Sequence, residues 1–126
     1  MYIPDEIKQD AREHFMRIRE LNDALRTCAD PILRLVINGQ LVITSGIHEL
    51  GDAYFKNAVA AVRAFNDFTP DNDPHGEHDF GSFELVGRKF FWKIDAYDAN
   101  MEFGSEDPAD PARTVRVLTI MLAEEY

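Results

Sequence analysis

Apolar side chains recur every three or four residues along the first part of the chain. This spacing predicts an amphipathic helix from Asp5 to Cys28, because it places them on one stripe of a helix. The stripe consists of Ile7, Ala11, Phe15, Ile18, Leu21, Leu25 and Cys28. Pro4 suits the first turn, and Asp30-Pro31 should end the helix, since proline disfavours helical geometry in the residue before it.

The next segment contains two apolar runs joined by an Asn-Gly dipeptide. The runs are Leu33–Ile37 and Gln40–Thr44, and Asn38-Gly39 lies between them. This dipeptide tolerates the positive φ angles of a type I′ turn. The pattern therefore predicts a β-hairpin, which Ser45-Gly46 ends.

A second helix and a loop are expected in the middle of the chain. Apolar residues at helical spacing predict a helix from Asp52 to about Asn66. They are Phe55, Val59, Val62 and Phe65. Phe68–His78 is predicted to be a loop, because Pro70, Pro74 and Gly76 lie there among short polar residues.

The last third of the chain predicts strands followed by a helix. Alternating residues indicate strands around Phe83–Leu85 and Phe90–Ala96, and Met101–Phe103 could add a short third strand. Asp110-Pro111 has the pattern of a helix start. The helix expected there is apolar on nearly all sides, which predicts a central position. It carries Val115, Leu118, Ile120, Met121 and Leu122.

These elements predict the fold class. The expected order is α-β-β-α-β-β-β-α, rich in hairpins and poor in crossovers. Such an order favours an α+β fold in which an antiparallel sheet built from hairpins is covered by three helices. At 126 residues the chain has the size of a single domain, so we expect residues 1–126 to form one.

Negative charge is concentrated in one part of the chain. The net charge is −10, and residues 67–112 hold 12 acids and 3 bases, which leaves −9 there. Two segments within this part have no base at all: Asp67–Phe80 and Asp95–Pro111, called here the two acidic segments. Direct nucleic-acid binding is not expected, since phosphate neutralisation requires a basic surface.

Cysteine content and hydropathy bear on the compartment. Cys28 is the single cysteine of the chain, so an internal disulfide is excluded. No apolar run has the length of a membrane span, and residues 1–6 lack the features of a signal peptide. We therefore expect a cytoplasmic protein.

Three stretches resemble an uncharacterised bacterial family, domain of unknown function 3768. They are Phe65–Gly81, Phe90–Asp95, and Asp107–Pro111 leading into Arg116–Tyr126. The resemblance implies a plasmid- or mobile-element-borne protein of alphaproteobacteria. It implies no activity and no catalytic residues.

The loop at 71–79 offers candidate metal ligands. It contains four carboxylates and two imidazoles, and His75, His78 and one of Asp73 or Asp79 could hold a zinc or manganese ion if the turn is tight. A calcium EF-hand is not expected, because Ser82 stands where a bidentate glutamate is needed. The alternative interpretation is that these side chains bond the loop's own backbone amides.

Two functions follow from these patterns. The first is a non-enzymatic, acidic interaction or regulatory protein that docks on a basic, nucleic-acid-handling partner. An inhibitor of host defence would suit the mobile-element setting. The alternative is a divalent-metal-dependent hydrolase that uses the Asp71–Asp79 loop. The residues expected to bind the partner are Asp71, Glu77, Asp98, Glu102, Glu106 and Asp107.

Overall fold

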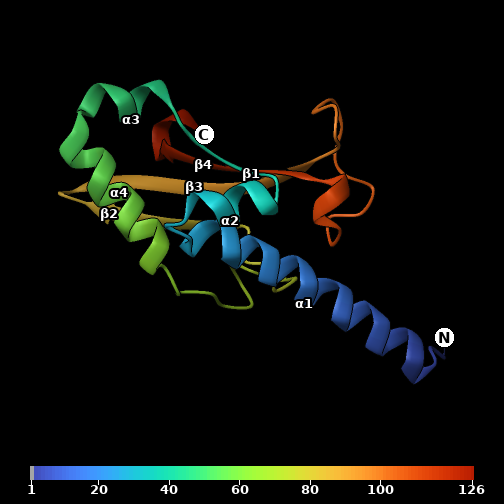
Figure 1. The fold of residues 1–126 in the computed structure, drawn as a ribbon. Coiled ribbons are helices and arrows are strands. Elements are labelled where there is room, and N and C mark those ends of the chain that lie inside the picture. The colour runs from blue at the N-terminus through green and yellow to red at the C-terminus, as the bar shows by residue number, and fades with distance from the viewer. Residues whose placement is uncertain (1) are drawn as a thin grey trace.

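The computed structural model describes residues 2–126, which form a mixed α+β fold (Figure 1). Four strands make one sheet in the order β1-β4-β3-β2. The elements along the chain are α1 (Asp5–Thr27), α2 (Pro31–Val36), β1 (Gly39–Ile43), α3 (Ser45–Leu50), α4 (Asp52–Ala64), β2 (Phe80–Leu85), β3 (Arg88–Tyr97), the 3-10 turn η1 (Pro111–Arg113), β4 (Val115–Leu122) and the 3-10 turn η2 (Ala123–Glu125).

The sheet is mostly antiparallel. Strands β2 and β3 form a hairpin, and β3 also pairs antiparallel with β4. Strand β1 joins the other side of β4 in parallel, so β1 and β2 are the edge strands. Trp92 lies at the centre, opposite Gly81 on one side and Ile120 on the other.

The core lies between one face of this sheet and the helices. Phe90, Trp92 and Ile120 of the sheet are completely buried, as is Ala58 of α4. Leu21 and Leu25 of α1 belong to the same apolar cluster. Burial of these large side chains, at about 1.5–3 kcal/mol each, is the main favourable contribution to folding.

Helix α1 covers the sheet with its second half. Figure 1 shows that its N-terminal half projects away from the rest of the chain. Residues 2–17 are exposed, whereas Ile18, Leu21 and Leu25 are buried. The predicted apolar stripe therefore meets the core from Ile18 onward.

The predicted hairpin at 33–44 is wrong. Residues Pro31–Val36 form helix α2, and strand β1 pairs with β4 rather than with the preceding run. The Asp30 carboxylate accepts a hydrogen bond from the Ile32 amide at 2.9 Å, and Pro31 occupies the first turn. Asp30-Pro31 therefore follows the end of α1, as predicted, and also begins the next helix, α2. Asn38 does have a positive φ of 53°, but its turn joins a helix to a strand.

The predicted C-terminal helix is also wrong. Val115–Leu122 is strand β4, the partner of both β1 and β3. A short apolar run fits a buried strand as well as a buried helix, and its β-branched residues favour the strand. Asp110 acts as the expected cap, accepting a bond from the Ala112 amide at 2.9 Å, but the turn it opens is η1.

Other expectations are confirmed at a coarser level. The α+β class, the helices at α1 and α4, and the β2–β3 hairpin are present. The expected order and the count of three helices are not, because residues 2–126 contain four α-helices. Met101–Phe103 forms no strand, and a single bridge joins Tyr97 to Gly104 instead. Over the described chain, every helix is too short or too polar to span a membrane.

Candidate functional site

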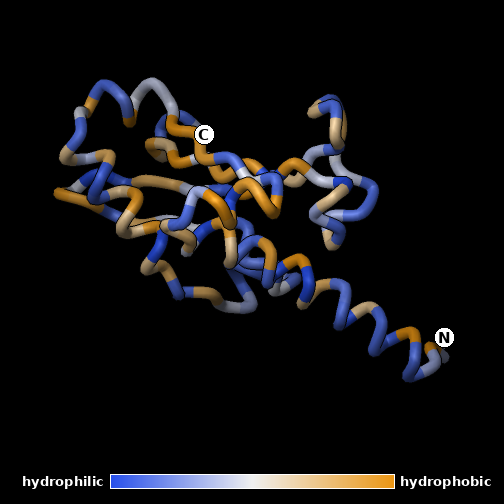
Figure 2. Tube along the Cα trace, in the orientation of Figure 1, coloured by the Kyte–Doolittle hydropathy of each residue, from blue (hydrophilic) through white to orange (hydrophobic). Residues whose placement is uncertain are grey.

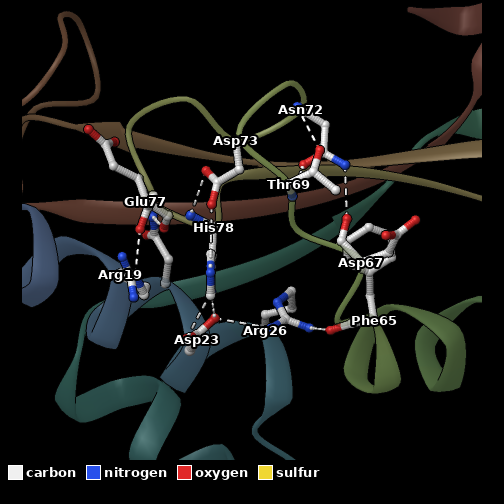
Figure 3. A network of polar contacts seen from close by, with 12 residues as sticks. Arg19, Asp23, Arg26, Phe65, Asp67, Thr69, Asn72, Asp73, Glu77 and His78 are labelled. Carbon is white, nitrogen blue, oxygen red and sulfur yellow. Dashed lines mark hydrogen bonds and ion pairs between the residues drawn. The ribbon is translucent and has the colours of Figure 1, made fainter.

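A polar stripe on α1 faces the long loop at 65–79, which joins α4 to β2. Figure 3 shows Arg19, Asp23 and Arg26 pointing from α1 toward this loop. With Asn22 they are spaced by three or four residues, so they lie on one side of the helix. Arg19 Nε donates to the Gly76 carbonyl at 2.5 Å, and Asn22 Nδ2 donates to the Glu77 carbonyl at 2.9 Å. The side chains of the stripe therefore hold the loop in place through the loop's backbone carbonyls.

His78 is held between two carboxylates. Its Nδ1 lies 2.9 and 3.1 Å from the Asp23 carboxylate oxygens, and its Nε2 lies 3.6 Å from Asp73 Oδ2. Its ring stacks on Phe68, with ring centroids 3.7 Å apart and an interplanar angle of 5°. The Asp23 oxygens are within hydrogen-bond distance of the ring, whereas the Asp73 oxygen lies farther away.

Arg26 lies beneath this histidine and is 5% exposed. Its Nη1 donates to the carbonyls of Val62 and Phe65, and its Nη2 pairs with Asp23 at 3.0 Å. The guanidinium also lies 5.2 Å from the ring centroids of Phe68 and Trp92. These contacts compensate for the desolvation of a buried charge and join α1 to the end of α4.

The loop also bonds itself. The Thr69 amide donates to Asn72 Oδ1 at 2.9 Å, and Asn72 Nδ2 donates to the Asp67 carbonyl at 2.9 Å. Asp73 Oδ1 accepts from the His78 amide at 3.2 Å. This agrees with the interpretation that polar side chains of the loop bond its own backbone.

The four predicted metal ligands are only partly brought together. Asp73 and His78 are adjacent, but His75 is exposed and stacks on Phe15 of α1 with centroids 5.9 Å apart. Asp79 is half-buried, and burial raises the pKa of its carboxyl. In the described part of the chain, no three His, Cys, Asp or Glu side chains form a group that could hold an ion. Metal binding by this loop stays a prediction.

The two acidic segments are linked through Asn22 of α1. Asn22 Oδ1 accepts from Arg116 Nε at 2.9 Å, while its amide bonds the Glu77 carbonyl. Arg116, on β4, is completely buried and also donates to the Pro108 carbonyl. Burial, together with the nearby charge of Arg17, lowers the pKa of Arg116 to about 10, so it stays cationic at neutral pH.

Few carboxylates of these segments are neutralised by a nearby base. The segments hold eleven acids. Within residues 2–126, three of them form ion pairs: Asp73 with His78, Asp95 with Lys93, and Glu106 with Arg113. Burial first, and then the charge of Asp79, raises the pKa of Glu77. The upward shift reflects mainly the desolvation of this half-buried carboxylate, to which the negative charge of Asp79 adds.

The second acidic segment encloses an open groove. Its volume is about 460 Å³, and its lining includes Asp98, Asn100, Phe103, Glu106 and Arg113. Phe103 is 72% exposed. Asp98 fixes the loop by accepting a bond from the Glu102 amide at 3.1 Å. The groove thus combines carboxylates with an exposed aromatic ring.

The residues expected to bind a partner differ in exposure. Asp71, Glu102 and Glu106 are exposed, while Glu77, Asp98 and Asp107 are half-buried. Asp107 Oδ1 accepts a bond from the Ala109 amide at 3.3 Å, so this carboxylate has a structural contact. A partner can therefore reach Asp71, Glu102 and Glu106, of which Glu106 already pairs with Arg113.

The comparison with protein families gives one match. The family described as "Protein of unknown function (DUF3768)" matches residues 43–125. The chain belongs to this family. No curated protein and no solved structure matches the chain.

The DUF3768 match includes both acidic segments and strands β2, β3 and β4. Helix α1, which supplies the polar stripe, precedes it. Sequence reasoning missed the stripe residues Asn22, Asp23 and Arg26. Their helical spacing beside the apolar stripe was a usable signal for a second contact face.

Proposed function

We propose that this DUF3768 protein is a non-enzymatic interaction protein whose acidic surface docks on a basic, nucleic-acid-handling partner. The observation that carries the proposal is the Asn22–Arg116 link, which ties Glu77 of one acidic segment to Pro108 of the other. The link holds one backbone carbonyl of each acidic segment against Asn22 and Arg116, and we infer that it brings the carboxylates of the two segments into one field. A field of one sign steers an oppositely charged partner.

Three arginines support the proposal by the atoms that they bond. Arg19 and Arg116 donate to carbonyl and amide oxygens, not to carboxylates of the acidic segments. Arg26 pairs with Asp23, which belongs to α1 itself. These cations hold the backbone of the segments in place while most of the carboxylates stay unpaired.

The groove at 98–113 fits a basic side chain. An arginine entering it would meet the carboxylate of Asp98 and the exposed ring of Phe103, and it would compete with Arg113, which also lines the groove, for the carboxylate of Glu106. Carboxylates bind guanidinium by charge-assisted hydrogen bonds, and an aromatic ring adds a cation–π contact. We expect an arginine or lysine of the partner to bind here.

The biological role we propose follows from the resemblance to mobile-element proteins. A small protein with an acidic surface can occupy the site where a host protein binds DNA. This would make the chain an inhibitor of host defence. The proposal places it in the cytoplasm with its partner.

Charge reversal tests the docking proposal. The variant Asp71→Lys/Glu102→Lys/Glu106→Lys changes three exposed acids of the acidic segments. Its matched control, Asp10→Lys/Glu49→Lys/Glu124→Lys, changes three exposed acids elsewhere by the same charge. We expect the natural chain and the control to retain a basic partner from a host lysate at low salt, and the first variant to lose it at least tenfold.

Two results would contradict this function. One is that no protein is retained at low salt and released at high salt. The other is an equal loss of the partner in both lysine variants, since that would show a general charge effect without a defined surface.

A further inference from the structure

Residues 31–48 are a nearly uncharged stretch in a highly charged chain. Arg34 is the single charged residue among these 18, whereas charged residues make up 29% of the whole sequence. The stretch includes α2 and β1. These residues therefore bring almost no charge of their own to the surface, and the nearest acid bonded to them is Glu125, at Thr44 and Gly46.

Helix α2 exposes large apolar side chains. Ile32, Leu33, Leu35 and Val36 are 69%, 40%, 75% and 68% exposed. Figure 2 shows hydrophobic colour along both α2 and β1. A run of four such residues differs from the scattered apolar residues that are normal on a surface, and contiguous patches mark interaction sites.

Strand β1 lies beside this patch and has one free edge. The Asn38 carbonyl and the Thr44 amide bond β4, so the even-numbered positions face that neighbour. Backbone groups of Gly39, Leu41 and Ile43 therefore point to the other side. Throughout residues 2–126, no side chain or other element bonds them there.

The free edge also lacks the usual protection. Native edge strands are protected by charged residues or proline, and Gly39–Ile43 contains neither. The opposite edge strand, β2, carries Glu84. Edge β1 is thus suited to pairing with another strand.

We propose that a second copy of this chain occupies this edge. The two β1 strands pair antiparallel about a twofold axis at Leu41, so that Gly39 of each copy faces Ile43 of the other. The two α2 helices then lie beside the new strand pair and cover each other's apolar residues. A twofold interface of this kind is self-complementary by construction.

Charge and size favour a second copy as the occupant. Each copy has a net charge of −10, so two copies repel each other over the acidic segments and approach most easily where acids are absent. A specific interface needs on the order of 500 Å² from each copy. Pairing along a five-residue edge roughly 17 Å long would also cover the four exposed apolar side chains beside it, which adds to the area available for such an interface.

Oligomeric state tests the proposal. Sedimentation equilibrium of the full chain, run from 1 to about 200 µM in screening salt, should show a monomer–dimer equilibrium. Leu35→Lys/Val36→Lys should weaken the dimer at least tenfold. The control Ile7→Lys/Val86→Lys changes two other exposed apolar residues by the same charge and should leave it intact. Leu35→Gln/Val36→Gln removes the same apolar side chains without adding charge, and it should also weaken the dimer.

Amide exchange locates the contact. In the dimer, the Leu41 and Ile43 amides should exchange at least tenfold more slowly than in the lysine variant. A chain that stays monomeric at 200 µM would overturn the proposal. A dimer that persists in the Leu35→Lys/Val36→Lys variant would also overturn it, and so would a dimer that dissociates in the control variant. A dimer in which these two amides exchange as fast as in the monomer would show that the contact lies elsewhere and would overturn it too.

Discussion

At the scale of single residues, Glu125 shows how one carboxylate joins distant segments. It accepts hydrogen bonds from the Thr44 hydroxyl at 2.6 Å, the Gly46 amide at 3.1 Å and the Leu122 amide at 2.9 Å. Burial acts to raise the pKa of Glu125, but these three bonds together outweigh it, and the pKa lies below its usual value of 4.5. The ionised form therefore binds the start of α3 to the end of β4.

Replacement of this carboxylate should lower stability in a pH-dependent way. We expect Glu125→Gln to reduce the free energy of unfolding by about 0.5–1.5 kcal/mol at pH 7, because it removes charge-assisted bonds at an exposed site. The ionised carboxylate stabilises the fold above pH 4.5, and this contribution is lost as the pH falls through the lowered pKa. Chemical denaturation at pH 7 and at pH 3 measures the difference.

The matched control is Glu124→Gln, because Glu124 is exposed and is its neighbour in the sequence. It should stay within about 0.5 kcal/mol of the natural chain at both pH values. An equal effect of both replacements, or a Glu125→Gln loss that persists at pH 3, would contradict the role given to this carboxylate.

At the scale of elements, Asn22 connects three parts of the fold. Its side chain donates to the loop at 65–79 and accepts from β4 through Arg116, while its backbone belongs to α1. It is 3% exposed. A buried amide in this position keeps both neighbours hydrogen-bonded, and no apolar side chain could do so.

Asn22→Ala should destabilise the protein by about 2–4 kcal/mol, because it leaves the Glu77 carbonyl and Arg116 Nε without partners in a buried site. Asn100→Ala, at an exposed loop position, should change stability by less than about 0.5 kcal/mol. The free energy of unfolding from urea titration distinguishes the two. A value for Asn22→Ala within 0.5 kcal/mol of the natural chain would show that the link is not structural.

The success of sequence reasoning differed between elements for physical reasons. Helices α1 and α4 and the β2–β3 hairpin follow from local periodicity, and they were predicted. The strand predicted at Gln40–Thr44 is present as β1, but its partner was wrong, because β1 pairs with residues more than 70 positions away. Strand β4 was predicted as a helix. The apolar run at Leu33–Ile37 has strand character, yet the cap at Asp30 makes most of it a helix.

The candidate site was predicted in part. The loop side chains were identified from composition, but Asn22, Asp23 and Arg116 come from elements that only the fold brings to the loop. Arg116 also lies inside an apolar run, where a charged residue is unexpected without buried partners. Its position was a signal that the run has a polar contact on one side.

At the scale of the whole molecule, charge divides the surface into two parts. The two acidic segments hold eleven acids and no base, whereas residues 31–48, which include α2 and β1, hold one charged residue, Arg34. We propose a different partner for each part, a basic protein for the first and a second copy for the other. A dimer would present two acidic surfaces and so bind a partner with two basic sites more tightly.

The central claim is that the acidic segments form one docking surface, and a nuclear magnetic resonance titration with an arginine-rich peptide tests it most directly. The account predicts backbone shift changes confined mainly to residues 71–79 and 98–110, and a loss of these changes as salt rises from 50 to 300 mM. Shift changes spread evenly over all exposed acids, or centred on α1 residues 5–13, would contradict it.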